Sequence, residues 1–318
     1  DRNVSTIALG ISGDGSAVVG ISLDPYQRTR AFRWTEATGI HDLGTLRADG
    51  SGNAWAFDAS RNGNVVVGMS YSDEAGNDRA FAWIEEATGG TSQDGQMFML
   101  EPFRGADRSG AHAVSADGNY AAGYSEVEDD VPIREAIRWD IGGLDEGRNA
   151  SITHLGTLGG GSSEATDISD DGVVVVGSSE LAGGDGVHAF RWVEDEQMYD
   201  LGVLEGHLGS SAVAVSGDGN VVVGASYDVD GRAWAFRWDE ADGMVSVEDW
   251  LAANDVVVGG VRLARAQAIN GNGFVIAGMM EAEDGSERAY IARVTPDSDP
   301  EPNPGPDPDP DPDPDPEP

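Results

Sequence analysis

The stretch that decides the fold is 165–177, which reads ATDISDDGVVVVG. An Asp-Gly pair separates two short runs, and the second run consists of valines, which favour β-strands. Asp-Gly between two such runs is typical of a tight β-hairpin. Five further segments repeat the pattern at intervals of 47 to 55 residues, so that the closing glycines are Gly20, Gly68, Gly123, Gly177, Gly224 and Gly278. Self-similarity at this period predicts a repeat fold.

Each hairpin is followed by a polar loop and a short aromatic strand, which reads Ala-Phe-Arg-Trp in the clearest copies (31–34, 189–192 and 235–238). A fourth run contains Asp-Leu-Gly or Leu-Gly, as at 42–46, 155–158 and 200–204. Only 246–254 has a helical pattern, with a serine cap and acids in its first turn. Four short strands in a unit of about 50 residues are typical of a propeller blade. We predict an all-β fold, a β-propeller of six four-stranded blades over 1–296; the alternative is a linear β-solenoid.

One repeated position in the predicted first strand favours radial packing. Four residues before the hairpin Ser or Asn, every copy has alanine: Ala8, Ala56, Ala111, Ala165, Ala212 and Ala266. If six first strands converge on a central axis, only a small side chain fits between neighbours. The sixth unit ends without an outer strand, and residues 1–6 are one candidate to close it, a segment outside the given sequence being the other.

Composition excludes several classes of function. The 318 residues contain 57 acidic and 19 basic residues, all arginine, for a formal charge of −38. A chain this acidic does not present a broad basic face, so we expect neither nucleic-acid binding nor adsorption to anionic membranes. Without cysteine there is no disulfide scaffold or zinc-thiolate site. No apolar run approaches the roughly 20 residues of a membrane-spanning helix, so we expect no membrane insertion. The Pro-Asp-rich segment 297–318 predicts an acidic, extended linker or tail.

The segment HAFRW at 188–192, followed by MYDLG at 198–202, resembles the HAF-repeat family of extracellular bacterial repeat proteins. The resemblance covers nearly all of 7–294 and includes both the hairpin and the aromatic strand. It implies export, an extracellular or cell-surface location, and attachment through the C-terminal tail to an anchoring or secretion module. It implies no reaction. The other copies replace His188 by Arg30, Arg79, Glu135, Trp234 and Arg288, which argues against a shared role for this histidine.

The repeated strand arginines have a structural interpretation. We predict that each pairs with the turn aspartate of its own blade through charge-assisted hydrogen bonds; the alternative is an anion-binding ring. The arginines are Arg33, Arg138, Arg191 and Arg237, and the aspartates are Asp14, Asp117, Asp171 and Asp218. The Ser-x-Asp-Gly turns themselves are explained by an aspartate that accepts from its own backbone and a glycine with positive φ.

The loops between the second and third strands differ from blade to blade and are rich in acids. Clustered carboxylates are the ligands that Ca²⁺ prefers, so Ca²⁺ is the candidate cofactor. The alternative is a solvated acidic surface suited to high salt, consistent with the absence of lysine. The candidate metal ligands are Glu128, Asp129, Asp130, Asp228 and Asp230.

Side chains near the start of the first and third strands are candidates for a ligand site, because propeller loops and strand entries share one face. Aromatic rings next to charged groups suit a carbohydrate, whose rings stack and whose hydroxyls form hydrogen bonds. The candidates are Trp55, His112, Glu164, His188, Trp234 and Arg265. The two tryptophans are alternatively packing residues, as we predict for those of the aromatic strands. The five histidines have no metal-ligand spacing, and no nucleophile motif is present, so no catalytic residue is assigned.

The sequence therefore predicts an exported, surface-associated propeller used for binding or display, with an extracellular carbohydrate or surface protein as partner. One alternative is an extracellular polysaccharide lyase or glycosidase acting in the funnel through Glu164, His112 or Arg265. The other alternative is a structural adhesin or filament subunit.

Overall fold

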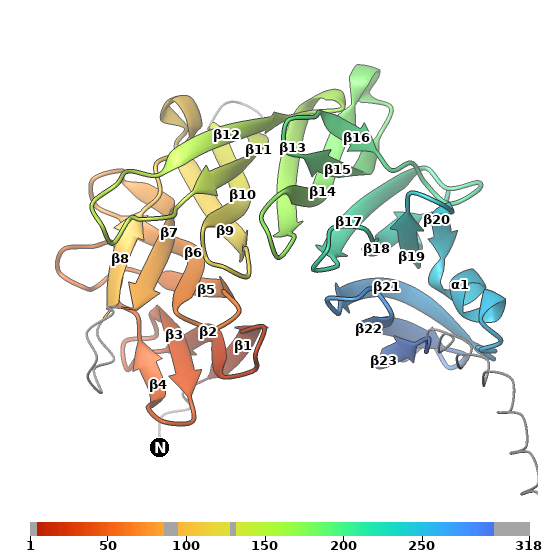
Figure 1. The fold of residues 1–318 in the computed structure, drawn as a ribbon, viewed down its shortest axis with the longest axis horizontal. Coiled ribbons are helices and arrows are strands. Elements are labelled where there is room, and N and C mark those ends of the chain that lie inside the picture. The colour runs from red at the N-terminus through yellow and green to blue at the C-terminus, as the bar shows by residue number, and fades with distance from the viewer. Residues whose placement is uncertain (1–4, 86–94, 128–131, 296–318) are drawn as a thin grey trace, which may run out of the picture.

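The computed structural model describes residues 5–85, 95–127 and 132–295. The predicted tail at 297–318 and three candidate metal ligands, Glu128, Asp129 and Asp130, lie outside these described residues. Within them, six antiparallel sheets follow one another around a central axis (Figure 1), which confirms the predicted six-bladed β-propeller. No helix of the described part is long and apolar enough to cross a membrane.

Five sheets have four strands and the sixth has three. The first three are β1 (Thr6–Ile11), β2 (Ala17–Leu23), β3 (Thr29–Thr35) and β4 (Gly39–Asp42); β5 (Ala54–Ala59), β6 (Val65–Ser72), β7 (Asn77–Glu85) and β8 (Gly95–Met99); and β9 (Arg108–Val114), β10 (Tyr120–Val127), β11 (Ile133–Asp140) and β12 (Ser151–Gly156). The others are β13 (Gly159–Ile168), β14 (Val174–Leu181), β15 (Val187–Val193) and β16 (Met198–Asp200); β17 (Gly209–Val215), β18 (Val222–Tyr227), β19 (Ala233–Asp239) and β20 (Gly243–Ser246); and β21 (Val261–Ile269), β22 (Val275–Ala282) and β23 (Glu287–Arg293).

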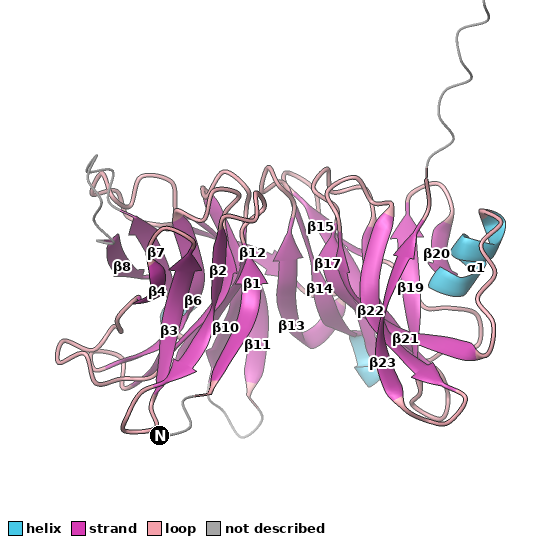
Figure 2. Ribbon diagram, turned by 90° about the horizontal axis from the view of Figure 1, so that it is seen from below, coloured by secondary structure: helices cyan, strands magenta, loops and turns pink. Residues whose placement is uncertain are grey.

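A short helix, α1 (Val247–Ala253), connects the fifth blade to the sixth. Ser246 caps it by accepting a hydrogen bond from the Asp249 N–H, as predicted. Three-residue 3₁₀ turns lie at Phe103–Gly105 and Ala182–Gly184. All hairpins between first and second strands lie at one end of the axis, the upper end in Figure 2, and the loops between second and third strands lie at the other. We call these the tip end and the loop end.

The hairpin turns follow the predicted chemistry. In the first blade, Asp14 Oδ1 accepts from the Ser12 hydroxyl at 2.9 Å and from the Ser16 N–H at 2.8 Å. Gly15 has φ of +74°, in the left-handed region that glycine tolerates. Asp117, Asp171 and Asp218 make the same bonds to the serine two residues earlier. The turn aspartates thus bind their own backbone.

The repeated alanines lie between blades. Ala56, Ala111, Ala165, Ala212 and Ala266 are fully buried, each in a core cluster shared with the preceding blade. Ala8 is exposed, because the blade that would precede it does not pack against it. Small size is therefore required by contact between neighbouring blades, and the one exception marks an open junction.

The prediction that each strand arginine pairs with its own turn aspartate is wrong. Arg33 Nε donates to the Gly63 carbonyl of the next blade at 2.7 Å, and its guanidinium approaches Glu85 there. Arg138 and Arg191 reach the next blade in the same way, through Gly172 O at 2.6 Å and Gly219 O at 3.1 Å. The arginine side chains at this third-strand position point to the following blade. The turn aspartate of the arginine's own blade already accepts hydrogen bonds from the serine hydroxyl and a backbone N–H of its hairpin. In the fifth blade, Arg237 pairs with Asp239 instead of Asp218.

Backbone hydrogen bonds join the hairpin tips of successive blades. The Asp14 N–H donates to Arg61 O at 2.9 Å. In the same way, the N–H groups of Arg61, Ala116, Asp170 and Gly217 donate to the carbonyl oxygens of Ala116, Asp170, Gly217 and Gly271, respectively. Among the described residues, no equivalent bond joins the sixth blade to the first. On the first blade, Ile7, Leu9 and Ile11 are 45–61% exposed, and Trp34 is 37% exposed, whereas its counterparts Trp83, Trp139 and Trp192 are buried. The blades therefore form an arc with an open junction.

The sixth blade has no fourth strand in the described part of the chain. Thr6 does not close it, because Thr6 begins β1 and pairs with Ser22 of the first blade. Ser5 likewise accepts a hydrogen bond from the Leu23 N–H. The other residues proposed as a closing strand, 1–4, lie outside the described residues.

Candidate functional site

The first strands of all six blades surround the axial channel. Near the tip end they enclose a cavity of about 340 Å³, to which every blade contributes, from Ile11 in β1 to Ile269 in β21. Arg61 of the second blade and Asp170 of the fourth form an ion pair of 2.5 Å across the lining of this cavity. Hairpin residues thus line the cavity at the tip end.

Besides Asp170 in its hairpin, two carboxyl groups of first strands line this cavity, Asp58 on β5 and Asp167 on β13. Asp58 Oδ2 accepts from the Val114 N–H at 2.9 Å, and Asp167 Oδ2 accepts from the Val215 N–H at 2.8 Å. Burial raises the pKa of Asp58 to about 6. Burial, with the nearby charge of Asp58, raises the pKa of Asp167 to about 7. Each carboxyl group ties its own blade to the next one and titrates near neutral pH.

A second group of side chains lies toward the loop end, between the third and fourth blades. Arg134 donates to Glu126 Oε2 and to Glu164 Oε2, both at 2.6 Å. Glu164 Oε1 lies 3.7 Å from Nδ1 of His112. His112 Nδ1 lies 3.0 Å from the Ala165 carbonyl oxygen, which makes this nitrogen the protonated one. We call His112, Tyr124, Glu126, Arg134 and Glu164 the blade 3–4 cluster.

Aromatic rings frame the blade 3–4 cluster. The His112 ring lies 5.6 Å from Phe57, edge to face, and 5.4 Å from Tyr124. The Arg134 guanidinium lies 4.4 Å from the centre of the Tyr124 ring, within cation–π range. Burial raises the pKa of Tyr124, so its hydroxyl stays protonated. The cluster combines aromatic surface with fixed donors and acceptors.

The structure brings His112 and Glu164 together, but among the described residues no hydrogen bond, ion pair or ring contact joins them to the other ligand candidates. Trp55 lies in β5 at the repeat position of Glu164, two blades away, and Arg265 is exposed on β21 at the same position. Trp234 contacts His207 and Arg262, at 6.2 Å and 5.5 Å, on the fifth and sixth blades. The predicted ligand residues are therefore distributed around the loop end.

His188 lies in a structural pair. Its Nδ1 is 2.9 Å from Asp200 Oδ1. Arg30 and Asp42 form the equivalent pair in the first blade, at 2.9 Å. In both blades the pair ties the start of the third strand to the end of the fourth, and the aspartate also accepts from the glycine two residues later.

The described acidic loops bind their own backbone. Asp228 Oδ1 accepts from the Asp230 and Arg232 N–H groups, both at 2.9 Å. The bond from the Arg232 N–H lowers the pKa of Asp228. Asp230 pairs with the Arg232 side chain at 3.1 Å. Among the described residues, no three His, Asp or Glu side chains are arranged to hold a metal ion.

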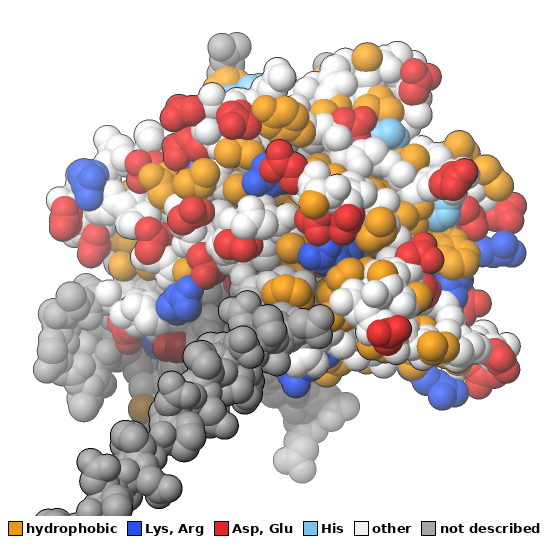
Figure 3. Space-filling model, turned by 45° about the vertical axis from the view of Figure 1, so that its right-hand side comes forward, with side chains coloured by type: hydrophobic (Ala, Val, Ile, Leu, Met, Phe, Trp, Pro, Cys, Tyr) orange, Lys and Arg blue, Asp and Glu red, His pale blue; other side chains and the backbone are white. Residues whose placement is uncertain are grey.

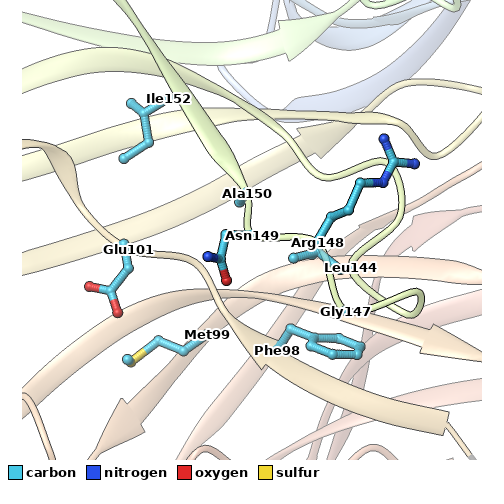
Figure 4. A pocket seen from close by; sticks show the side chains of 9 residues that line it. All are labelled: Phe98, Met99, Glu101, Leu144, Gly147, Arg148, Asn149, Ala150 and Ile152. Carbon is cyan, nitrogen blue, oxygen red and sulfur yellow. The ribbon is translucent and has the colours of Figure 1, made fainter.

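The sequence interpretation missed a cavity at the rim of the second and third blades (Figure 4). Its volume is about 320 Å³, and its wall combines Phe98 and Met99 of β8 with Leu144, Arg148 and Ile152 of the third blade. The arginine and Glu101 are its charged groups. The loop that supplies Arg148 belongs to one blade alone, so no repeat pattern could reveal it.

The sequence interpretation also missed the two axial carboxyl groups, although a signal was present. Asp58 and Asp167 occupy the repeat position two residues after the buried alanine. The other blades have glycine or alanine there: Gly10, Ala113, Ala214 and Ala268. An acid at a position otherwise reserved for very small residues indicates a special environment.

No protein-family profile matches this sequence, and no curated protein matches it. Solved structures do resemble it. A protein described as TolB, from Agrobacterium tumefaciens, has 18% identity and a TM-score of 0.51, with 92% of this chain and 91% of that chain covered. A puromycin hydrolase has 16% identity and a TM-score of 0.55, over 91% of this chain and 45% of that one. Prolyl oligopeptidase B from Galerina marginata has 11% identity and a TM-score of 0.54, over 91% and 42%. This chain thus spans less than half of these two enzymes, and the likeness shows the propeller fold alone.

Proposed function

We propose that the protein is an exported, surface-associated binding or display propeller, whose blade 3–4 cluster takes an extracellular carbohydrate. The observation that carries the proposal is the convergence of His112, Arg134 and Glu164 beside the rings of Phe57 and Tyr124. Sugars bind through aromatic faces and through fixed hydrogen-bonding groups, and this loop-end site provides both. Export rests on the resemblance to the HAF-repeat family.

Binding without turnover is the favoured role. Arg134 engages both carboxylates of the cluster, an arrangement suited to a rigid hydrogen-bonding surface. The acid and nucleophile of a glycosidase instead flank the scissile bond. The alternative, a polysaccharide lyase or glycosidase, is supported by the proximity of His112 to Glu164.

A glycan array followed by calorimetric titration of the best glycan tests the proposal. We expect Phe57→Ala, which removes the half-buried ring beside His112, and Glu164→Gln to weaken binding about tenfold or more, as for the loss of a stacking ring or of a charged hydrogen bond. Asp230→Asn, in an exposed loop of the fifth blade, is the matched control and should bind as the parent does. Unchanged affinity in Phe57→Ala and Glu164→Gln would contradict the site, and turnover abolished by Glu164→Gln would establish the enzyme alternative.

A further inference from the structure

A small cavity on the fourth blade adjoins the blade 3–4 cluster. Glu164 of β13 lines it, together with Glu180 of β14 and Val187 of β15. Its volume is about 120 Å³, which is below the roughly 300 Å³ of ordinary ligand pockets. We call it the Glu164–Glu180 pocket. Because Glu164 belongs to both, a ligand of the cluster can place a substituent, but not a whole sugar ring, in this pocket.

Four serines make up the rest of the wall: Ser162, Ser163, Ser178 and Ser179. Ser162 Oγ donates to the Arg134 carbonyl oxygen at 3.1 Å, and Ser163 Oγ donates to the Gly156 carbonyl oxygen at 2.7 Å. Ser179 Oγ donates to the Ser162 carbonyl oxygen at 3.3 Å. Each of these three oxygens also accepts one backbone N–H. Because their protons are used by backbone carbonyl groups, what these hydroxyl groups offer a ligand is a lone pair.

Negative charge accompanies these acceptors. Glu180 is exposed, and its Oε2 accepts from the Gly161 N–H at 3.1 Å. Glu164 pairs with Arg134 on the cluster side, but Arg134 also pairs with Glu126. In the described part of the chain, no basic residue lines the pocket itself. The pocket therefore favours a group that is positively charged and donates hydrogen bonds.

The charge balance also separates classes of carbohydrate. Arg108 and Arg134 both contact Glu126. Arg134 contacts Glu164 as well, and Glu180 adds a third carboxylate. A uronic acid or a sulfated sugar would bring further negative charge to a site in which these carboxylates outnumber the two arginines. The ammonium group of an amino sugar instead brings a positive charge and three donors.

We propose that the carbohydrate bound at the blade 3–4 cluster is an amino sugar with a free amine, and that its ammonium group lies in the Glu164–Glu180 pocket. This inference rests on the carbohydrate function proposed above and specifies its ligand. The ammonium group donates to Glu164, to Glu180 and to a serine hydroxyl oxygen, while a sugar ring lies against Phe57. N-acetylation removes the charge and two of the three donors, so an N-acetylated sugar loses both ion pairs.

Three tetrasaccharides with the same β-1,4-linked backbone isolate the amine, because they differ only at carbon 2: the tetramers of glucosamine, N-acetylglucosamine and glucose. In calorimetric titration of the full chain, we expect the glucosamine tetramer to bind about tenfold more tightly than the other two, as for a charged hydrogen bond. Equal affinities for the three would overturn the amino sugar and leave the carbohydrate function standing. Absence of binding by every glycan, in the array and in the titrations, would overturn both proposals.

Matched protein variants locate the amine. Glu180→Gln keeps an oxygen for the Gly161 N–H, and it should weaken binding of the glucosamine tetramer about tenfold without changing that of the glucose tetramer. Glu240→Gln removes the same charge from the exposed turn between β19 and β20 and is the control. Equal effects of the two substitutions would overturn the pocket as the amine site, because attraction by net charge alone predicts them. Tighter binding of a tetralysine peptide than of the glucosamine tetramer would overturn the sugar as the source of the amine.

Discussion

At the scale of single residues, the closing glycines show how tightly the first two strands of each blade approach. A Cβ placed on Gly177 would lie 2.0 Å from the Glu164 carbonyl oxygen, and equivalent contacts of 1.9–2.1 Å occur at Gly20, Gly68 and Gly278. A bulge beside the buried alanine produces this approach. The glycines were visible in the sequence because the requirement is local to one hairpin.

Gly177→Ala should therefore lower the free energy of unfolding by about 1–3 kcal/mol or more, because the new methyl group meets backbone rather than a movable side chain. Urea denaturation measures the change. Gly259→Ala is the control, since nothing lies within 4 Å of that position and its φ is not positive. Equal stability of the two variants would contradict the close approach.

The axial carboxyl groups predict a pH dependence. Free Asp ionises near pH 4, whereas Asp58 and Asp167 ionise at about 6 and 7 in the folded protein. Between about pH 4 and 7 the folded state holds protons that the unfolded chain has released, so their contribution to stability falls as pH rises through this window. Asp167→Asn keeps an acceptor for the Val215 N–H and should flatten the decline. Urea melts from pH 4.5 to 7.5 measure this, with exposed Asp230→Asn as control; an unchanged slope in Asp167→Asn would refute the assignment.

At the scale of elements, contacts between blades determine most of what the sequence could not show. The strands and turns are local, so their repeat was readable. The partner of Arg33 was not readable, because Gly63 and Glu85 belong to the next blade. The blade 3–4 cluster was only half predictable for the same reason. His112 and Glu164 share a face in the repeat, but Tyr124, Glu126 and Arg134 join them through the second and third strands.

The interblade alanines give a prediction with an internal control. Ala165→Leu inserts three carbons between the third and fourth blades and should cost about 1–3 kcal/mol of stability by overpacking. Ala8→Leu makes the same change at the exposed equivalent on the open junction, and it should be nearly neutral. Thermal or urea unfolding compares them. Equal costs at the two positions would contradict the open junction.

At the scale of the whole molecule, the formal charge of −38 acts on stability and association. Figure 3 shows carboxylates spread over the visible face, with arginines beside several of them. The described loop acids accept hydrogen bonds from backbone and serine, as Asp284 does from Ser286. This pattern favours a solvated acidic surface, while calcium stabilisation remains a prediction to be tested.

Raising NaCl from about 10 mM to about 0.5 M should raise the Tm, because shorter screening lengths reduce repulsion between the carboxylates. CaCl₂ at matched ionic strength distinguishes a solvated acidic surface from a calcium site. A further rise in Tm that chelation reverses would demonstrate a calcium site. Equal Tm values in NaCl and CaCl₂ would contradict a calcium site.

Among the described residues, five hydrogen bonds join the hairpin tips of successive blades and none joins the sixth blade to the first, which has a mechanical consequence. A closed circle of six blades changes its diameter only if an interface breaks, whereas a split circle widens or narrows by small adjustments shared among five hinges. The width of the axial cavity lined by Asp58 and Asp167 then varies with the distance between the first and the sixth blade. A molecule that binds both the first and the sixth blade would bring their facing sides together and narrow the axial cavity without contacting the residues that line it.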